Sequence, residues 1–407
     1  MTFSEIPFSD LLLKIIDNRG KTCPTSENGL PLIATNCIKN DSLYPTLEKV
    51  RYVSKETYNT WFRGHPEPED MIFVTKGSPG NVCWVPDPVN FCIAQDMVAI
   101  RADEKKVYPK FLFALLRSQT TQMKISNMHV GTLIPHFKKG DFNKLLLTIP
   151  IDFTLQKKIG DYYFNISDKI TLNTTMNQTL EAIAQTIFKS WFVDFEPFKE
   201  GKFIESEMGM IPEGWEVKDI GNEVETLGGG TPSTSNSEYW ENGTINWFSP
   251  TDLTKGNSVF YHQSSKKINA LGLANSSAKL FPAYSLMMTS RATIGEIGIN
   301  IEESSTNQGF ITLIPTKKLP LEYLYFWLIA QLPEVHSLAS GSTFKEISKS
   351  NFRKFKVILP IEPIMKKFIT AVKPIFEQIR QNQQQIQTLT TLRDTLLPKL
   401  MSGEVRV

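Results

Sequence analysis

TLEAIAQTIFKSWF, at residues 179–192, and TLTTLRDTLLPKLM, at residues 388–401, decide the organisation of this chain because they are two copies of one pattern. They align without a gap at an offset of 209 residues, the difference between 388 and 179. Apolar residues recur at spacings of three and four in both copies, which is typical of a helix that packs on another helix through one face. Ile183 and its counterpart Leu392 belong to this apolar stripe. The sequence therefore predicts two related helices.

Both patterns continue towards the N-terminus as heptads, so each helix approaches forty residues and a length of roughly 60 Å. One seam position of the heptad is apolar throughout, except for a single asparagine at the same place in each copy. The seam residues of the two helices are Ile159, Ile166, Asn173, Leu180 and Ile187 in the first and Phe368, Ile375, Asn382, Leu389 and Leu396 in the second.

A lone asparagine in such a seam has two readings. A buried asparagine fixes the register of two helices, because any other register leaves its amide unpaired. An asparagine that faces water at a splayed part of the seam has no such role. Pro374 adds a second alternative, since proline removes a helical hydrogen bond. The second helix either kinks there or begins regularly only after it.

The repeat extends beyond the helices. GTLIPHFKKGDFNKLLLTIP (131–150) aligns with GSTFKEISKSNFRKFKVILP (341–360) at an offset of 210. MIFVTKGSPGNV (71–82) aligns with LMMTSRATIGEI (286–297) at an offset of 215. The offset drifts slowly because diverged copies of one domain differ by small loop deletions. Repeats of this size are whole domains and not solenoid units.

The elements repeat in the same order in both copies. In the first copy we predict strands at 71–74 and within 92–100, followed by a helix at 108–124 that opens near Pro109. The second copy has matching strands at 285–289 and 309–314 and a helix at 321–331.

The predicted fold is α+β, with two repeated globular domains separated by two long helices that form an antiparallel coiled coil. The predicted boundaries are 1–150 for the first domain, 151–197 for the central long helix and the segment after it, 198–210 for a linker, 211–360 for the second domain and 361–407 for the C-terminal long helix.

Composition places the chain among ordinary water-soluble proteins. It has 407 residues, 41% hydrophobic and 21% charged, with a net charge of +2. Polar residues interrupt the start of the chain, which argues against a signal peptide. The longest apolar run is far too short for a membrane span. Its cysteines have no C-x-x-C spacing, so we expect buried thiols in the cytoplasm: Cys23, Cys37, Cys83 and Cys92.

The two long helices suggest how such a molecule could bind DNA. An antiparallel pair of about 60 Å rods holds two domains at opposite ends. One turn of DNA is about 34 Å, so two such domains could read two half-sites separated by unread bases. The balanced total charge allows this, because a local basic face can lie within it.

The candidate DNA contacts are repeated basic and hydroxyl residues. Lys76 and Arg291 occupy equivalent places, each followed two residues later by a hydroxyl, Ser78 or Thr293, in a glycine-containing turn. Arginine can bind guanine bidentately, and a hydroxyl can contact a base edge or the backbone. A second set of cations is predicted to neutralise phosphates or to be simply solvated: Lys138, Lys139, Lys144, Lys345, Lys349, Arg353, Lys354 and Lys356.

Catalytic signatures are mostly absent. The chain has no Walker A sequence, no nucleophile elbow, no H-E-x-x-H and no tetrapeptide of the kind an amino-methyltransferase uses. Asp87, Glu104 and Lys106 fit the loose spacing of a metal-dependent nuclease. The second copy lacks this pattern, and a solvated charged turn is the alternative.

Several motifs together resemble one family. They are TIFKSWFVDFEPF, IPEGWEVKDIG, GGGTPSTSNSEYWENGTINWFSPTDL, GLANSSAKLFP, SRATIG and TLLPKLMSGEVRV. In this order along the whole chain, they resemble the specificity subunit of type I restriction-modification systems. The third motif contributes Ser233 and Ser249 as further candidate DNA contacts. The first copy lacks the GGGTPST-like opening, so its loop contacts are less closely indicated.

The resemblance implies two target-recognition domains, each of which reads one half of a bipartite DNA site. It implies a subunit without chemistry or bound cofactor of its own. Two methyltransferase subunits would bring S-adenosylmethionine, and restriction subunits would bring ATP, Mg and the nuclease. Two other hypotheses remain open at this point, a free-standing two-headed DNA-binding scaffold and the metal-dependent nuclease.

Overall fold

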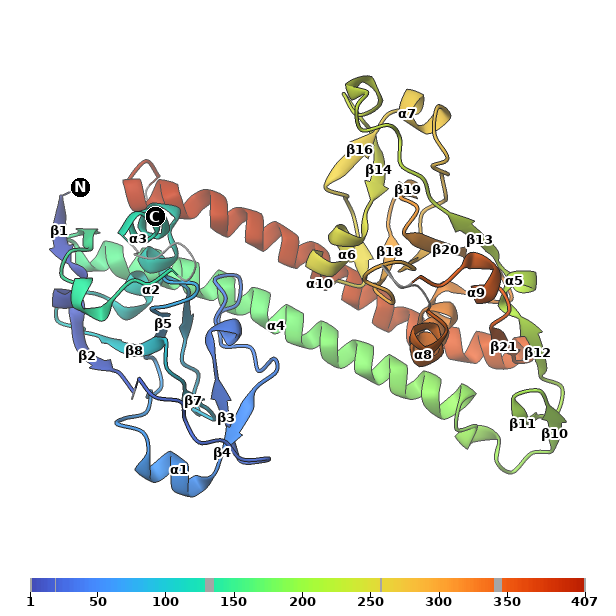
Figure 1. The fold of residues 1–407 in the computed structure, drawn as a ribbon, viewed down its shortest axis with the longest axis horizontal. Helices are drawn as coiled ribbons and strands as arrows, with labels where there is room; N and C mark the ends of the chain where they lie inside the picture. Colours follow the sequence, from blue (N-terminus) through green and yellow to red (C-terminus); the bar gives the residue numbers. More distant parts are fainter. Residues whose placement is uncertain (1, 19, 129–134, 257, 340–345, 406–407) are drawn as a thin grey trace. The chain divides into compact units, whose positions relative to one another are not determined.

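The computed structural model describes residues 2–18, 20–128, 135–256, 258–339 and 346–405. The chain divides into two compact units. The first comprises Met1–Asn173 and Gln385–Val407, and the second comprises Thr174–Gln384. Two long helices, α4 (Phe153–Phe192) and α10 (Glu362–Ser402), each contribute one half to each unit (Figure 1).

Besides its parts of the two long helices, the first unit combines short strands with short helices (Figure 1). Its elements are β1 (Phe3–Pro7), β2 (Leu12–Ile16), β3 (Leu30–Ile33), β4 (Arg51–Val53), α1 (Lys55–Thr60), β5 (Met71–Val74), β6 (Val82–Trp84), β7 (Cys92–Ile93), β8 (Met97–Ala102), α2 (Pro109–Arg117), α3 (Gln119–Met128) and β9 (Leu146–Pro150). The main sheet has the order β2-β8-β5-β6, a smaller sheet has the order β4-β3-β7, and β1 pairs with β9.

The elements of the second unit are β10 (Phe203–Ser206), β11 (Gly209–Pro212), β12 (Glu216–Asp219), α5 (Ile220–Glu223), β13 (Glu225–Gly228), β14 (Ile245–Phe248), α6 (Pro250–Gly256), β15 (Phe260–Tyr261), β16 (Lys266–Ile268), α7 (Ala270–Ala274), β17 (Leu286–Thr289), β18 (Ile297–Asn300), β19 (Ser304–Thr306), β20 (Phe310–Ile314), α8 (Leu321–Leu338), α9 (Lys349–Phe352) and β21 (Lys356–Leu359). The second unit repeats the order of the first and adds elements, among them the hairpin β10–β11, the helix α6 and the strand β15.

The strand pairings show that the two units share one topology. The second main sheet, β13-β20-β17-β18-β15, repeats the order of the first and adds β15 at its edge. In the smaller sheets, β3 runs antiparallel to β4 and parallel to β7, just as β14 runs antiparallel to β16 and parallel to β19. The predicted α+β duplication is confirmed.

Buried apolar runs explain the central strands. All four residues of β5 and all four of β17 are buried, as expected for strands covered on both faces. The predicted strand within 92–100 is divided by a turn at Asp96, which has a φ of 73°, so it forms β7 and β8.

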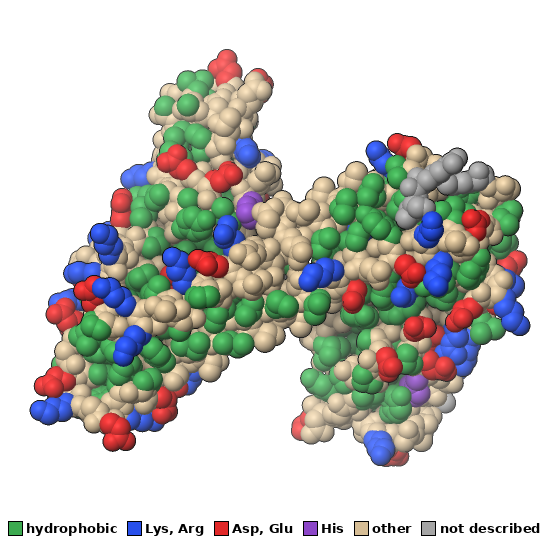
Figure 2. Space-filling view, turned by 180° about the vertical axis from the view of Figure 1, so that it is seen from behind, with side chains coloured by type: hydrophobic (Ala, Val, Ile, Leu, Met, Phe, Trp, Pro, Cys, Tyr) green, Lys and Arg blue, Asp and Glu red, His purple; other side chains and the backbone are tan. Residues whose placement is uncertain are grey.

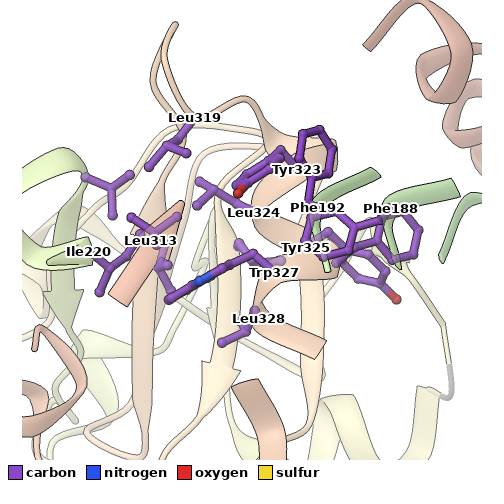
Figure 3. Close-up of a cluster of buried hydrophobic side chains, with 14 of the residues drawn as sticks. Phe188, Phe192, Ile220, Leu313, Leu319, Tyr323, Leu324, Tyr325, Trp327 and Leu328 are labelled. Carbon is purple, nitrogen blue, oxygen red and sulfur yellow. The ribbon is translucent and has the colours of Figure 1, made fainter. Parts of the chain in front are cut away.

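The core of the second unit joins the sheet to both long helices. Phe188 and Phe192 of α4 lie against Tyr323 of α8, with ring centroids 5.3 and 4.9 Å away (Figure 3). Phe192 also packs on Phe368 of α10, at 4.9 Å. Each fully buried phenylalanine contributes roughly 1.5–3 kcal/mol to folding. These contacts anchor the domain to the helices of its own unit.

In the first unit, α2 docks closely on α4. A Cβ at Gly160 would lie 2.5 Å from the backbone nitrogen of Phe111, so only glycine allows this approach. Tyr108 donates a hydrogen bond from its hydroxyl to Asp161 at 2.6 Å. Leu397 and Leu400 of α10 are buried in the same core.

The long helices run antiparallel in both units. In the first unit, the Asn173 amide donates to Gln385 at 2.7 Å, and Tyr163 meets Arg393, so the numbering falls on α10 as it rises on α4. In the second unit, Asn177 pairs with Asn382 while Phe192 meets Phe368. The seam residues are buried or half-buried, and Asn173 and Asn382 are only 1% and 5% exposed.

The apolar stripe of the helices is narrower than the sequence suggests. Ile183 and Leu392 are 47% and 42% exposed, so they lie outside the helix contact. A straight helix has 3.6 residues per turn, so a heptad pattern drifts around it and brings one apolar row to the surface.

Three local predictions need correction or refinement. The helix α10 begins at Glu362 and continues through Pro374, so it does not begin only after that proline. The helix predicted at 108–124 is two helices, because Ser118 is extended and its hydroxyl caps α3 at Thr121. The segment predicted as a linker, 198–210, contains most of a β10–β11 hairpin, whose turn uses Gly209 at a φ of 89°.

Candidate DNA interface

The loop that follows β5 carries Lys76 and Ser78 and is held by backbone hydrogen bonds on both sides. Thr75 donates to the carbonyl of Asp96 at 2.9 Å and accepts from Phe137 at 2.8 Å. Gly80 closes the loop by donating to Val74 at 3.0 Å. The loop is therefore built on the main sheet and braced by the segment before β9.

The loop that follows β17 has the same framework in the second unit. Ser290 donates to the carbonyl of Gly309 at 2.8 Å and accepts from Ile347 at 3.0 Å. Gly295 closes the loop on Thr289 at 3.0 Å. These bonds match those of the first loop one by one, and Lys76 and Arg291 follow the equivalent residues Thr75 and Ser290.

The residue after each cation has a left-handed backbone. Gly77 has a φ of 88° and Ala292 a φ of 64°. Alanine adopts this conformation only at a cost of roughly 1–2 kcal/mol, so the surrounding bonds must impose the loop shape. Ser78 and Thr293 are exposed at the ends of these turns. The two candidate cations and the two candidate hydroxyls therefore occupy equivalent loops.

Each loop cation lies near a carboxylate of its own unit. Lys76 Nζ is 3.8 Å from Asp96 Oδ1, and Arg291 Nε is 3.8 Å from Glu346 Oε2. The Lys76 and Arg291 side chains are 42% and 46% exposed, which leaves both open to a ligand.

The basic segment of the first unit, which precedes β9, lies beside the loop that carries Lys76. Gly77 donates to the carbonyl of Pro135 at 2.9 Å, two residues before Phe137. Lys138 is exposed, and Lys139, also largely exposed, forms a 2.6 Å ion pair with Asp17. These cations remain at the surface near the loop, where phosphates could reach them.

The basic segment of the second unit is divided between two roles. Lys349 is exposed at the start of α9, whereas Lys345 lies outside the described residues. Arg353 donates to the carbonyl of Gly221 at 2.6 Å, and Lys356 forms ion pairs with Glu207 and Asp219 at 2.5 and 2.9 Å. Arg353 is therefore used within the domain and Lys356 is paired with two carboxylates of its own unit, which their sequence positions did not reveal.

The two serines from the glycine-rich motif differ in surroundings. Ser233 is exposed in the loop before β14, and its hydroxyl lies 2.8 Å from that of Ser235. Ser249 is half-buried, and both its amide and its hydroxyl donate to Asp252 at 2.7 Å. The hydroxyl of Ser249 thus contributes to the turn into α6, and its contact with DNA stays a prediction.

Sequence patterns missed a hollow beside the first loop. Its volume is about 430 Å³, and its lining is Pro79, Gln119, Gln122, Met123, Ser126 and Pro135. Gln122 donates to the Gly80 carbonyl at 2.8 Å, and His336 lies at the corresponding place beside Gly295 in the second unit. The stretch 105–140 contains no aspartate or glutamate, and this signal could have identified the surface.

Charges of both signs occur together on the surface of each unit. In the view of Figure 2, lysine and arginine side chains are interspersed with aspartate and glutamate on this face.

The nuclease alternative gains no support from the described part of the chain. Within those ranges no three His, Cys, Asp or Glu side chains are grouped to hold a metal ion. Lys106 instead donates to the Asp10 carbonyl at 2.8 Å and lies 3.4 Å from Asp103.

Two further sequence predictions concern the cysteines and the membrane. All four cysteines are buried free thiols, as predicted. Burial raises the pKa of Cys92 to about 12, so this thiol stays protonated. Among the helices of the described residues, none is long and apolar enough to cross a membrane.

The structure thus defines an internally duplicated protein with two equivalent cationic loops, each on its own α+β domain. Comparison with known proteins agrees. The family model described as "Type I restriction modification DNA specificity domain" matches residues 14–182 and 212–391. The chain belongs to this family of type I restriction-modification specificity subunits, which confirms the resemblance found in the sequence.

Individual relatives span most of the chain. It is 30% identical over 400 residues to the type I restriction enzyme HindI specificity subunit of Haemophilus influenzae, covering 82% of this chain and 86% of the relative. It is 29% identical over 333 residues to the MjaIX specificity subunit of Methanocaldococcus jannaschii, covering 79% and 76%. Both relatives are named as specificity subunits, in agreement with the predicted non-catalytic role.

The fold is also similar to a solved structure. The crystal structure of the S subunit of a type I restriction-modification system from M. genitalium matches with a TM-score of 0.62 and 14% sequence identity. The match covers 98% of this chain and 96% of that chain. It supports the duplicated fold over its full length.

Proposed function

We propose that this chain reads a bipartite DNA site, with one half-site assigned to each unit, and directs the other subunits of a type I restriction-modification complex to it. The observation that carries the proposal is the equivalence of the two loops after β5 and β17. Both place a cation next to a left-handed residue and an exposed hydroxyl, on matching backbone hydrogen bonds. Such groups suit recognition of base edges and phosphates.

The difference between the two loops supports a different base preference for each unit. Lys76 offers a compact ammonium, whereas Arg291 offers a planar group that can bind guanine through two parallel hydrogen bonds. A duplicated fold with different loop chemistry suits a site whose halves differ in sequence. The bases between the two half-sites would then not be recognised.

The chemistry belongs to partner subunits on this proposal. Two methyltransferase subunits would bind S-adenosylmethionine and flip the target adenine, and restriction subunits would bring ATP and Mg. The complex would act on double-stranded DNA in the cytoplasm. This chain would contribute DNA contacts and a frame, and would bind none of these cofactors itself.

Methylation mapping tests the proposal. The chain is co-expressed with its methyltransferase subunit in a host that lacks other adenine methylation, and the control carries the methyltransferase subunit alone. We expect a methylated bipartite motif with a fixed unread spacer only when both proteins are present. Two soluble proteins without such a motif would contradict the proposal and favour a free-standing DNA-binding scaffold.

A further inference from the structure

The carboxylates that face the two loop cations come from different places in the repeat. Asp96 corresponds to Gly309, because their carbonyls accept the equivalent bonds from Thr75 and Ser290. Glu346 corresponds to His136, because each forms the isolated bridge to the loop cation of its unit. The cations are thus equivalent, while their acidic neighbours are not.

Backbone contacts place both acidic residues next to their loop cations. The amide of Lys76 donates to the Asp96 carbonyl at 3.2 Å, and Glu346 is bridged to Arg291 through the main chain. Both ion-pair distances are 3.8 Å. Two non-equivalent positions of the repeat therefore each place a carboxylate 3.8 Å from the equivalent loop cation.

Stability does not account for this arrangement. The side chains of Asp96 and Glu346 are 37% and 48% exposed, and exposed ion pairs contribute only about 0–1 kcal/mol. A carboxylate beside a loop that binds DNA would also repel phosphates and lower affinity for any duplex. A group that reduces general affinity in both units points to a role in discrimination.

We propose that Asp96 and Glu346 are positioning residues that set the specificity of the two loops, an inference that rests on the proposed function. Each carboxylate attracts its cation to one side, at 3.8 Å, and competes with phosphate oxygens for it. A non-specific phosphate offers one contact that must displace the carboxylate. A correctly placed base edge offers acceptors that the cation can reach while the carboxylate still orients it.

The test compares Asp96→Asn and Glu346→Gln with the wild type, each as the full chain assembled with its methyltransferase subunit. Binding is measured over a salt series for a duplex that carries the mapped motif and for a mixed-sequence duplex that lacks it. We expect affinity for the mixed-sequence duplex to rise about three- to tenfold, with a salt slope steeper by about 0.9 because one more phosphate is engaged.

Methylation maps provide the second readout. Affinity for the motif duplex should change less than affinity for the mixed-sequence duplex, so discrimination falls. Each variant should relax base preference in one half-site and leave the other unchanged. A merely structural role would lower affinity for both duplexes and would not relax a single half-site.

Matched controls remove the same charge elsewhere in each unit. Glu48→Gln breaks the exposed 3.0 Å pair with Lys39, and Glu216→Gln breaks the exposed 3.1 Å pair with Lys218. Both should keep the discrimination of the wild type. Thermal unfolding checks that all four variants fold.

Two negative outcomes are distinguishable. A wild-type motif with unchanged discrimination in Asp96→Asn and Glu346→Gln would overturn the role of the carboxylates and leave the proposed function standing. A wild-type complex that methylates no bipartite motif would overturn the proposed function and this inference with it.

Discussion

The side-chain amide of Asn382 donates a hydrogen bond to Oδ1 of Asn177 at 2.8 Å, joining the two long helices inside the second unit. Gln378 donates in turn to Oδ1 of Asn382 at 2.8 Å. Asn382 is 5% exposed, so it does not face water at a splayed seam. Its proposed role in fixing the register remains a prediction.

Replacing one asparagine of the pair should lower the free energy of unfolding more than replacing both. We predict that Asn382→Ala lowers the free energy of unfolding by about 1–3 kcal/mol, because Asn177 and Gln378 lose a partner in a largely buried place. Replacement of Asn177 and Asn382 together by leucine should recover most of that loss. A double-mutant cycle of Asn177→Ala, Asn382→Ala and the double alanine variant, followed by urea unfolding, measures the coupling, with Gln381→Ala at an exposed position as control. Additive effects would show that the pair is not coupled.

Charge reversal in the loops should separate the two half-sites. Arg291→Glu is expected to weaken or relax recognition of one half-site only, and Lys76→Glu the other, because each cation belongs to its own unit. Methylation mapping of each variant with the methyltransferase subunit measures this. Equal loss across both half-sites from either single change would contradict the assignment of one unit to each half-site.

The glycine-rich loop before β14 supplies a sharply controlled stability test. A Cβ at Gly229 would lie 2.1 Å from the Asn307 carbonyl oxygen, whereas a Cβ at Gly228 meets nothing within 4 Å. Gly229→Ala should therefore lower the free energy of unfolding of the second unit by about 2–4 kcal/mol, because the backbone must shift to make room for the Cβ. Gly228→Ala should change stability by less than about 1 kcal/mol. Similar melting temperatures for the two variants would show that the loop yields easily.

His262 should make the second unit sensitive to acid. Burial lowers its pKa from the usual value of 6.5, and its Nε2 is buried without a hydrogen-bond partner. The unfolded chain therefore binds a proton more readily than the folded one, so stability falls as the pH drops below about 6.5. Urea unfolding at pH 7.5 and 5.5 should show a smaller loss for His262→Gln than for the wild type. The exposed His336→Gln variant is the control, and equal losses in all three proteins would exclude His262 as the cause.

Local patterns were sufficient for the parts of this protein that repeat along the chain. The spacing of apolar residues predicted α4 and α10, because a helix takes its contacts from residues three and four apart. The aligned loops predicted that Lys76 and Arg291 occupy equivalent places, because an inherited duplication preserves the order of elements. The apolar runs of β5 and β17 predicted buried strands for the same local reason.

Other features depend on residues that meet only in three dimensions. Asp96 and Glu346 could not be paired with the loop cations from the sequence, because they occupy non-equivalent positions of the repeat. In the sequence Arg353 resembles the other surface cations. Its hydrogen bond to the carbonyl of Gly221, 132 residues away in the sequence and 2.6 Å away in space, appears only in the structure.

The sequence by itself determined the duplication, the two long helices and the family, since each depends on residue order and short-range periodicity. Only the tertiary structure decided which cations stay exposed at the loops and which are used within the domain. Long-range backbone bonds, such as Phe137 to Thr75 and Ile347 to Ser290, bring distant acidic and basic residues together, and no local pattern encodes those meetings.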